Sequence, residues 1–401
     1  MKKLLYVTGS RAEYGIMKRL LLKLNQDSEI DLKIVATAMQ VDERYGMTYK
    51  VIEEDGLNID KLINIQLDNS NNEKVIHSMA ICLDKFGKYL YNNEFDAIIL
   101  LGDRYEILSV AIAAAIQNIP IIHLHGGEIT LGNYDEFIRH SITKMSKLHL
   151  VSTAEYRKRV IQLGENPNSV HNIGSLGAEN SLTLPLLSYE NLLDRFQLEN
   201  REYFVVLFHP ETLTENSIEN QMVNLLEAID IYKKNYNFIF IGSNSDTGSN
   251  IIYNMLNNYT NKNNFKFLTS VKSEEYLSLV KYSKGLIGNS SSGLIEVPSL
   301  NVPTINIGDR QKGRVRGKSV IDVRANKGEI DKAIKTILTK EYRSKLKDMR
   351  NPYYQENSLE KAYQIIKEFL NSQNIKKLKE YGILIRHGSP KNGYWEIVVE
   401  N

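Results

Sequence analysis

The feature of this 401-residue sequence that most constrains its fold is the alternation of short apolar runs with longer segments of helical periodicity. Runs rich in leucine or β-branched residues predict strands at 4–7, 32–36, 97–101, 121–123 and 149–152. Segments with helical spacing lie between most of them. This pattern is typical of a parallel, doubly wound α/β sheet with helices on both faces.

A second series of the same kind predicts a second domain. Its strand-like runs lie at 204–208, 238–241, 265–268, 285–288 and 304–307. We therefore expect a first domain at 1–175 and a second at 176–370, joined by a linker and lead-in at 174–202. A tail follows at 371–401, basic at first and strand-like at 394–399, and we assign it no function. Two domains imply a cleft between them.

Charge and cysteine content limit the possible partners and compartments. The formal charge is +2, from 50 basic and 48 acidic residues, so no overall field favours nucleic acid or an anionic membrane. Cys82 is the only cysteine, which suits a reducing cytoplasm. The apolar runs are too short for a signal peptide or a membrane span. We expect a cytoplasmic protein that binds any anion at a local site.

Ligands of parallel sheets bind beyond the carboxyl ends of the strands, so the loops at those ends are candidate sites. TGSRAEYG at 8–15 carries Arg11, which either binds phosphate or lies in a tight turn. This segment lacks the GxGxxG pattern, and we expect no dinucleotide cofactor. In LGDRYE at 101–106, Asp103 and Arg104 follow a strand, and Asp103 is either a helix cap or a catalytic carboxylate.

The segment HLHGGEITLGNYDEFIRH at 123–140 is unusually rich in ionisable residues for a loop and helix start. Gly126 and Gly127 free the backbone after the strand, so that these groups face a cleft. The histidines do not form an HExxH motif and no cysteine pair accompanies them, so we expect no metal. At the end of the segment, Arg139 and His140 are compatible with a solvent-facing helix surface. The ionisable residues are His123, His125, Glu128, Asp135, Glu136, Arg139 and His140.

Loops of the second domain carry polar residues at the matching strand ends. His209 in FHPETL is either structural or part of a site opposite the first domain. Asn244 lies in a polar loop at 241–249 that either binds a ligand or forms Asx turns. Arg310 belongs to a basic stretch, either an anion clamp or a nucleic-acid patch, and the near-neutral chain favours the clamp.

The strongest binding motif is GNSSSGLIEVP at 288–298. Ser290 and Ser291 follow a strand at a helix start, where backbone amides and the helix dipole favour phosphate. Ordinary capping by one serine is the alternative. Glu296 is expected about one and a half turns into that helix, with its carboxylate free to accept from sugar hydroxyls.

Seven motifs in this order resemble those of the hydrolysing UDP-N-acetylglucosamine 2-epimerases, especially the bacterial members that serve sialic acid biosynthesis. The similarity covers about residues 1–370. It implies a glycosyltransferase-B type fold, an active site in the interdomain cleft, a last helix that returns to the first domain, and a homo-oligomer. The motifs are TGSRAEYG, LGDRYE, HLHGGE, DEFIRHSITKMS, FHPETL, GNSSSGLIEVPSL and NIGDRQKGR.

The resemblance also implies a reaction and the residues for it. UDP-N-acetylglucosamine and water become N-acetylmannosamine and UDP, by anti elimination through 2-acetamidoglucal and then hydration. Asp103 and Asp135 match the family's catalytic carboxylates, and His209 orients or protonates the leaving diphosphate. Glu128 and His125 assist, although His125 stands where many relatives have glutamate. UDP contacts are implied for Arg11, Arg104, His209, Asn244, Ser290, Ser291, Glu296 and Arg310, and uracil contacts for Val271 and Tyr276.

Three related interpretations stay open at the level of sequence. A non-hydrolysing epimerase returns UDP-N-acetylmannosamine, and a glycosyltransferase uses the same fold. A hydrolysing enzyme for UDP-diacetylbacillosamine differs only in pocket shape around C4 and C6 of the sugar. A catalytically inactive UDP-sugar sensor is disfavoured because the acidic residues are intact.

Overall fold

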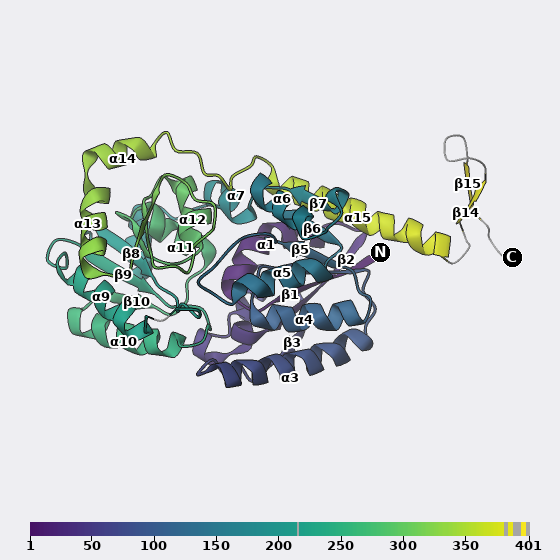
Figure 1. Cartoon of the computed structure of the whole chain (residues 1–401), viewed down its shortest axis with the longest axis horizontal. Coiled ribbons are helices and arrows are strands. Elements are labelled where there is room, and N and C mark those ends of the chain that lie inside the picture. The colour runs from purple at the N-terminus through teal and green to yellow at the C-terminus, as the bar shows by residue number, and fades with distance from the viewer. Residues whose placement is uncertain (215, 381–383, 388–393, 398–401) are drawn as a thin grey trace.

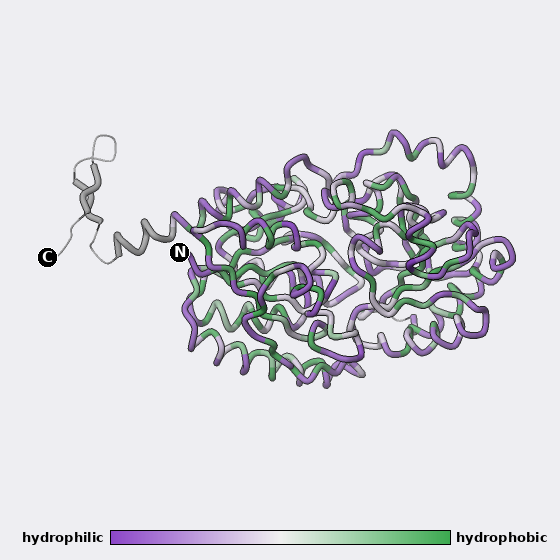
Figure 2. Tube along the Cα trace, turned by 180° about the vertical axis from the view of Figure 1, so that it is seen from behind, coloured by the Kyte–Doolittle hydropathy of each residue, from purple (hydrophilic) through white to green (hydrophobic). Residues whose placement is uncertain are grey.

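The structure is a computed structural model that describes residues 1–214, 216–380, 384–387 and 394–397. It contains two large parallel sheets, each with helices on both faces, that lie next to each other (Figure 1). Apolar residues concentrate on the strands and on the inward faces of the helices (Figure 2). The predicted α/β class with two parallel-sheet domains is confirmed.

The first sheet has seven parallel strands, and its order reverses between β1 and β4. A reversal of this kind opens a crevice at the carboxyl ends of the two strands. The edge strands β3 and β7 escape sequence prediction because β7 has only three residues and β3 has charged residues and three exposed positions. In spatial order the strands are β3 (Ile59–Ile63), β2 (Ile30–Thr37), β1 (Lys2–Thr8), β4 (Ala97–Leu101), β5 (Ile121–Leu124), β6 (Leu148–Val151) and β7 (Val170–Asn172).

Helices cover both faces of this sheet. One face packs against α1 (Arg11–Asn25), which begins with a capping box between Ser10 and Glu13. The other face packs against α3 (Asn72–Tyr91), α4 (Tyr105–Ile116) and α5 (Asp135–Met145). Shorter elements complete the domain: η1 (Ala38–Val41), η2 (Glu43–Tyr45), α2 (Tyr49–Glu54), α6 (Ala154–Gln162) and η3 (Pro167–Ser169).

The second sheet has six parallel strands and reverses between β8 and β11. The carboxyl ends of these two strands therefore form a second crevice, opposite the first. In spatial order the strands are β10 (Lys266–Leu268), β9 (Asn237–Ile241), β8 (Tyr203–Leu207), β11 (Leu286–Gly288), β12 (Thr304–Ile307) and β13 (Val320–Val323). The helices are α8 (Tyr189–Phe196), α9 (Ile218–Asp230), α10 (Ser249–Asn263), α11 (Ser273–Lys281), α12 (Ser292–Ile295), η4 (Val297–Leu300), α13 (Lys327–Leu338) and α14 (Lys340–Leu346).

The predicted linker and lead-in at 174–202 contains two helices. It contains α7 (Leu176–Thr183) and α8. Leu176 packs in the core of the first domain, whereas Leu192 of α8 packs in that of the second. Burial of these apolar side chains stabilises both helices, and Pro185 lies in the non-helical segment between them.

The last long helix, α15 (Ser358–Glu380), lies against the first domain (Figure 1). Ala362, Ile366 and Leu370 are buried in the same core as α1. The helix continues ten residues past Leu370, where the helix-like sequence pattern ends. An antiparallel pair follows, β14 (Leu384–His387) with β15 (Tyr394–Ile397), and residues 398–399 of the predicted strand lie outside the described residues. In the described parts of the chain, no helix has the length and apolar content needed to cross a bilayer.

Replacing Ile366 with alanine should destabilise the protein by about 2–5 kcal/mol, because it leaves a cavity between α15 and α1. The matched control is Glu368→Ala on the exposed face of the same helix, which should change stability by less than about 0.5 kcal/mol. Chemical denaturation of both variants measures the difference. Equal stabilities for the two variants would show that α15 does not contribute to the core.

Candidate active site

A cavity lies between the carboxyl ends of the two sheets and is lined from both domains. Every predicted site residue except Glu128 lines it, although their roles in binding and catalysis stay predictions. From the first domain come Arg11, Asp103, Arg104, His125 and Asp135. From the second come His209, Asn244, Val271, Tyr276, Ser290, Ser291, Glu296 and Arg310.

Asp103 follows β4 and is held by arginines. It accepts a hydrogen bond from Nη2 of Arg139, and Nη2 of Arg314 lies 3.8 Å from its Oδ2. The N-cap of α4 is Arg104 and no side chain caps it, so the interpretation of Asp103 as a cap is wrong. Arg139 is fully buried, which also corrects its expected place on a helix surface. Burial raises the pKa of Asp103, but the two guanidinium groups outweigh it, and the net pKa is lowered.

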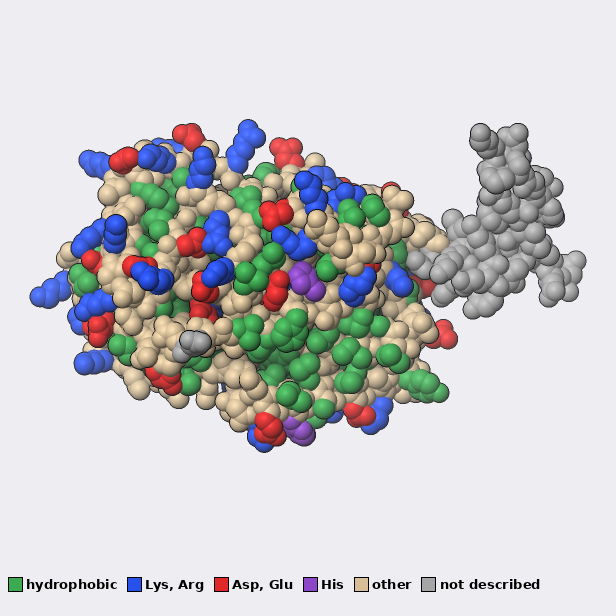
Figure 3. Space-filling view, viewed as in Figure 1, with side chains coloured by type: hydrophobic (Ala, Val, Ile, Leu, Met, Phe, Trp, Pro, Cys, Tyr) green, Lys and Arg blue, Asp and Glu red, His purple; other side chains and the backbone are tan. Residues whose placement is uncertain are grey.

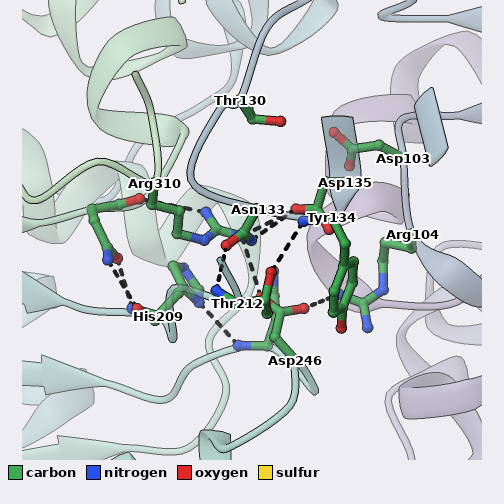
Figure 4. Close-up of polar contacts among 12 residues, drawn as sticks. Asp103, Arg104, Thr130, Asn133, Tyr134, Asp135, His209, Thr212, Asp246 and Arg310 are labelled. Atoms are coloured by element: carbon green, nitrogen blue, oxygen red, sulfur yellow. Dashed lines mark hydrogen bonds and ion pairs between the residues drawn. The ribbon is translucent and has the colours of Figure 1, made fainter. Parts of the chain in front are cut away.

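Asp135, in the first turn of α5, has the opposite electrostatic environment. Burial raises its pKa to about 7, and the negative charges of Asp103 and Asp246 add to the rise. Nη2 of Arg310 is 3.7 Å from Oδ2 of Asp135 and partly offsets the shift. The same cleft thus contains one carboxylate that is ionised at neutral pH and one that titrates near neutral pH (Figure 4). Carboxylate pairs with such divided pKa values are typical of acid and base catalysts.

His125 and Glu128 form a buried pair behind this carboxylate site. Nδ1 of His125 lies 3.3 Å from Oε1 of Glu128, which also accepts a hydrogen bond of 2.9 Å from Ser152. Burial raises the pKa of Glu128, but the Arg314 charge and the His125 hydrogen bond lower it below its usual range. Nε2 of His125 is buried without a hydrogen-bond partner among the described residues. Because Nδ1 lies beside Glu128, Nε2 is the ring nitrogen left to interact with a molecule in the cavity.

The backbone at His125 is itself unusual. Its φ of +63° is a left-handed conformation, which costs a non-glycine residue about 1–3 kcal/mol. Gly127 follows at φ +78°, and a Cβ there would lie 2.6 Å from the carbonyl oxygen of Tyr156. The predicted need for glycine after β5 therefore has a steric cause at Gly127.

His209 is fixed as a neutral hydrogen-bond donor. Its amide donates to Oδ1 of Asn289 at 2.7 Å, and Nδ2 of Asn289 donates back to its carbonyl at 2.8 Å. Nδ1 of His209 accepts from the amide of Asn244 at 3.2 Å, which assigns the proton of the neutral ring to Nε2. Burial lowers the pKa of His209 well below 6.5, and the charges of Arg310 and Arg104 lower it further. Orientation of a ligand therefore fits this histidine better than proton donation.

The loop after β11 brings Ser290 and Ser291 to the cavity. Gly288 has a φ of +147°, and a Cβ there would lie 1.9 Å from the carbonyl oxygen of Leu207. The helix that follows, α12, has only four residues, so Glu296 is its C-cap and does not lie one and a half turns into a helix. Opposite this loop, Nη1 of Arg11 is buried without a hydrogen-bond partner among the described residues. Unpaired buried donors of this kind suit an anionic ligand.

Asp246 connects the two domains through arginines (Figure 4). Its Oδ1 is 3.3 Å from Nη1 of Arg104, and its Oδ2 is 3.3 Å from Nη2 of Arg310. Arg104 also pairs with Glu106 at 2.6 Å. Local sequence identifies Asp246 only as a residue in a polar loop, since its partners are far away along the chain. Arg139 had one local signal, its position one helical turn after Asp135.

Comparison with known proteins assigns this site to a family. A family model described as UDP-N-acetylglucosamine 2-epimerase matches residues 22–367. The polysialic acid biosynthesis protein P7 of Escherichia coli is 56% identical over 93% of this chain and 96% of its own length. The chain belongs to the UDP-N-acetylglucosamine 2-epimerase family. It is therefore an enzyme, and the predicted resemblance to this family is confirmed.

Other members of the family are also similar. A Campylobacter jejuni enzyme named GDP/UDP-N,N'-diacetylbacillosamine 2-epimerase (hydrolyzing) is 38% identical over 85% of this chain and 89% of its own. The solved structure of Methanocaldococcus jannaschii UDP-GlcNAc 2-epimerase, in complex with UDP-GlcNAc and UDP, has a TM-score of 0.76 and 22% identity. That alignment covers 91% of this chain and 99% of the other. The structural match supports the glycosyltransferase-B type fold.

The sequence predicts that the histidines at 123–140 hold no metal. Within the described ranges, no group of three or more histidine, cysteine or acidic side chains is arranged to hold a metal ion. The cleft carboxylates are instead placed beside arginines.

Gly288→Ala should lower the melting temperature and disturb the loop of Ser290 and Ser291, here called the serine loop, because the added Cβ meets the Leu207 carbonyl. Gly87→Ala is the matched control, since Gly87 lies in α3 and no atom comes within 4 Å of the place that a Cβ would occupy there. That control should be neutral or gain about 0.5–1 kcal/mol. Thermal melting of both variants measures these changes. An unchanged melting temperature for Gly288→Ala would contradict the close approach of β11 and β8.

Proposed function

We propose that this epimerase is of the hydrolysing type and converts UDP-N-acetylglucosamine and water to N-acetylmannosamine and UDP. This reaction would be the first step of sialic acid biosynthesis. The 56% identical Escherichia coli relative, named for polysialic acid biosynthesis, supports that role. The observation that carries the chemistry is the pair of cleft carboxylates, Asp103 and Asp135, with opposed pKa shifts.

The proposed reaction has two stages. A base takes the C2 proton, the C2–H electron pair forms the C1=C2 double bond, and the C1–O bond breaks to release UDP. Water then adds to C1 of the 2-acetamidoglucal, and a proton adds to C2 from the opposite face. The product is the free sugar with inverted C2, and all atoms are accounted for without an added oxidant or reductant.

In this proposal Asp103 is the base and Asp135 is the acid. Asp103 stays ionised because Arg139 and Arg314 face it. Asp135 is protonated below about pH 7 and can donate to the departing diphosphate or to C2. Arg310 and the Ser290 loop stabilise the developing negative charge of the leaving group.

In this proposal, two histidines act on the leaving group and on the attacking water. His209 donates from Nε2 to the diphosphate, in keeping with its neutral state. His125, oriented by Glu128, takes a proton from the attacking water. Arg11, Arg104, Asn244, Val271, Tyr276, Ser291 and Glu296 complete the proposed contacts with the nucleotide sugar.

A second candidate substrate is UDP-diacetylbacillosamine. Two relatives with hydrolysing activity on this sugar in their names are 38% and 32% identical to the chain. The higher identity to the polysialic acid relative favours UDP-N-acetylglucosamine.

We also infer a cytoplasmic homo-oligomer that uses no cofactor. Apolar side chains gather over α4 and α5 on the first domain (Figure 3), and exposed Phe137 is one of this domain's large apolar residues.

A proton NMR time course with each nucleotide sugar tests the proposed function. UDP-N-acetylglucosamine should yield UDP and free N-acetylmannosamine, and UDP-diacetylbacillosamine should react at least about tenfold more slowly. Formation of UDP-N-acetylmannosamine would identify a non-hydrolysing epimerase. Binding without turnover of either compound would identify a sensor.

Asp103→Asn should lower kcat by about 10²–10⁴, because it removes the proposed base and the negative charge that faces Arg139 and Arg314. Asp84→Asn on the exposed face of α3 is the control and should retain normal kcat. A coupled UDP-release assay measures both. Near-normal UDP release by Asp103→Asn would remove Asp103 from the mechanism.

The pH dependence tests Asp135 as the acid. Its pKa of about 7 means that the carboxyl group is protonated below that pH and ionised above it. The active form is lost on ionisation, so kcat/KM should fall as pH rises through about 7. Asp135→Asn should lack this alkaline limb. If kcat/KM of the wild type instead rises through pH 7, Asp135 acts as a base.

A further inference from the structure

Arg314 belongs to the second domain but contacts the carboxylates of the first. It lies in the loop between β12 and β13 and is 9% exposed. Its Nη2 is 2.7 Å from Oε2 of Glu128 and 3.8 Å from Oδ2 of Asp103. One guanidinium thus reaches both acidic groups across the domain boundary.

The backbone next to Arg314 is fixed to the rest of the molecule. The amide of Val315 donates to Oη of Tyr156 at 2.9 Å, and Oη of Tyr353 donates to the Val315 carbonyl at 2.7 Å. On the other side, Gly313 has a φ of +91°, and a Cβ there would lie 2.3 Å from Cγ2 of Ile129. The loop therefore passes closely over the first domain, and its register sets where the guanidinium lies.

Arg314 has buried N–H groups that make no hydrogen bond within the part of the chain that the structure describes, which is unfavourable for a side chain whose only role is a structural ion pair. Its Nε and Nη1 are buried without a hydrogen-bond partner among the described residues. Arg314 also lines the cavity. Because buried unpaired donors destabilise a fold, their presence here points to a role in the site.

Several charged groups face the same carboxylates. Asp103 faces Arg139 and Arg314 and is close enough to Glu128 and Asp135 to interact electrostatically. Glu128 faces Arg314, His125 and Arg139. Arg139 and His125 come from the first domain. Arg314 is the cation that the second domain adds to this group when the two domains are in contact.

We propose that Arg314 is a positioning residue that makes Asp103 and the His125–Glu128 pair competent for the reaction only when the second domain is docked on the first. This inference rests on the proposed function for its kinetic consequences. The loop anchored at Val315 places the guanidinium, and the guanidinium fixes Glu128, which in turn orients His125. Removal of the cation leaves the UDP contacts of Arg310 and the serine loop in place.

Kinetics of Arg314→Gln, Arg314→Lys and Lys318→Gln test this role. Lys318 is exposed in the same loop and is the matched control, with kcat and KM expected to stay at wild-type values. Arg314→Gln should lower kcat by about 10², with KM changed by less than about threefold. Arg314→Lys keeps the charge and should recover part of kcat. Normal kcat for Arg314→Gln overturns the proposal.

The pH profile separates positioning from general damage to the fold. Arg314 lowers the pKa of Asp103, so its removal raises that pKa and the ionised base is lost at a higher pH. The acidic limb of kcat/KM should therefore move to higher pH in Arg314→Gln and stay near its wild-type position in Arg314→Lys. A lower kcat with an unmoved acidic limb overturns the proposal.

A readout without turnover keeps this test separate from the proposed function. In a double-mutant cycle of Arg314→Gln and Glu128→Gln, the changes in melting temperature should be strongly non-additive, because the two side chains form one ion pair. Additive changes overturn the inference whatever the substrate is. Absence of wild-type turnover with non-additive melting refutes the proposed function alone.

Discussion

Some of the buried charges in the cleft are paired across the domain boundary, and the arrangement of the site depends on these pairs. Asp246 of the second domain lies between Arg104 and Arg310, and Arg314 reaches Glu128. A buried charge that loses its partner is strongly destabilising, on the order of 3–5 kcal/mol. Separation of the domains would remove one charged partner each from Arg104 and Glu128. The arrangement of charges in the cleft therefore depends on the contact between the domains.

The two parallel sheets explain why these groups meet. Each sheet reverses its order at one point, and the reversal directs the loops after β1, β4 and β5 toward those after β8, β9 and β11. Close backbone approach at Gly288 fixes the serine loop, and the packing of α15 on the first core connects the end of the second domain to the first. The fold thus places Asp103, His125 and Asp135 on one wall of the cavity and the loop of Ser290 and Ser291 on the other.

Sequence predicts the parts of this structure that local physics decides. Apolar periodicity identifies the main strands of both sheets, and polar loops after them contain the residues that line the cavity. Long-range contacts decide the rest: Arg139 is buried because Asp103 lies beside it, and α7 and α8 are helical because they pack on the two cores. The end of α12 at Glu296 does have a local cause, because Pro298 disfavours α-helical geometry at Val297. His125 contacts Glu128, a residue three positions away, and the part that each takes in proton transfer stays a prediction.

In the proposed mechanism, the cleft removes the C2 proton as UDP departs and then adds a proton derived from solvent to the opposite face of C2. Turnover of UDP-N-acetylglucosamine in heavy water, followed by mass spectrometry and NMR of the sugar, tests this step most directly. Elimination and hydration predict one deuterium at C2 of the N-acetylmannosamine, because the new C2 hydrogen comes from solvent. N-acetylmannosamine without deuterium at C2 would contradict the elimination route.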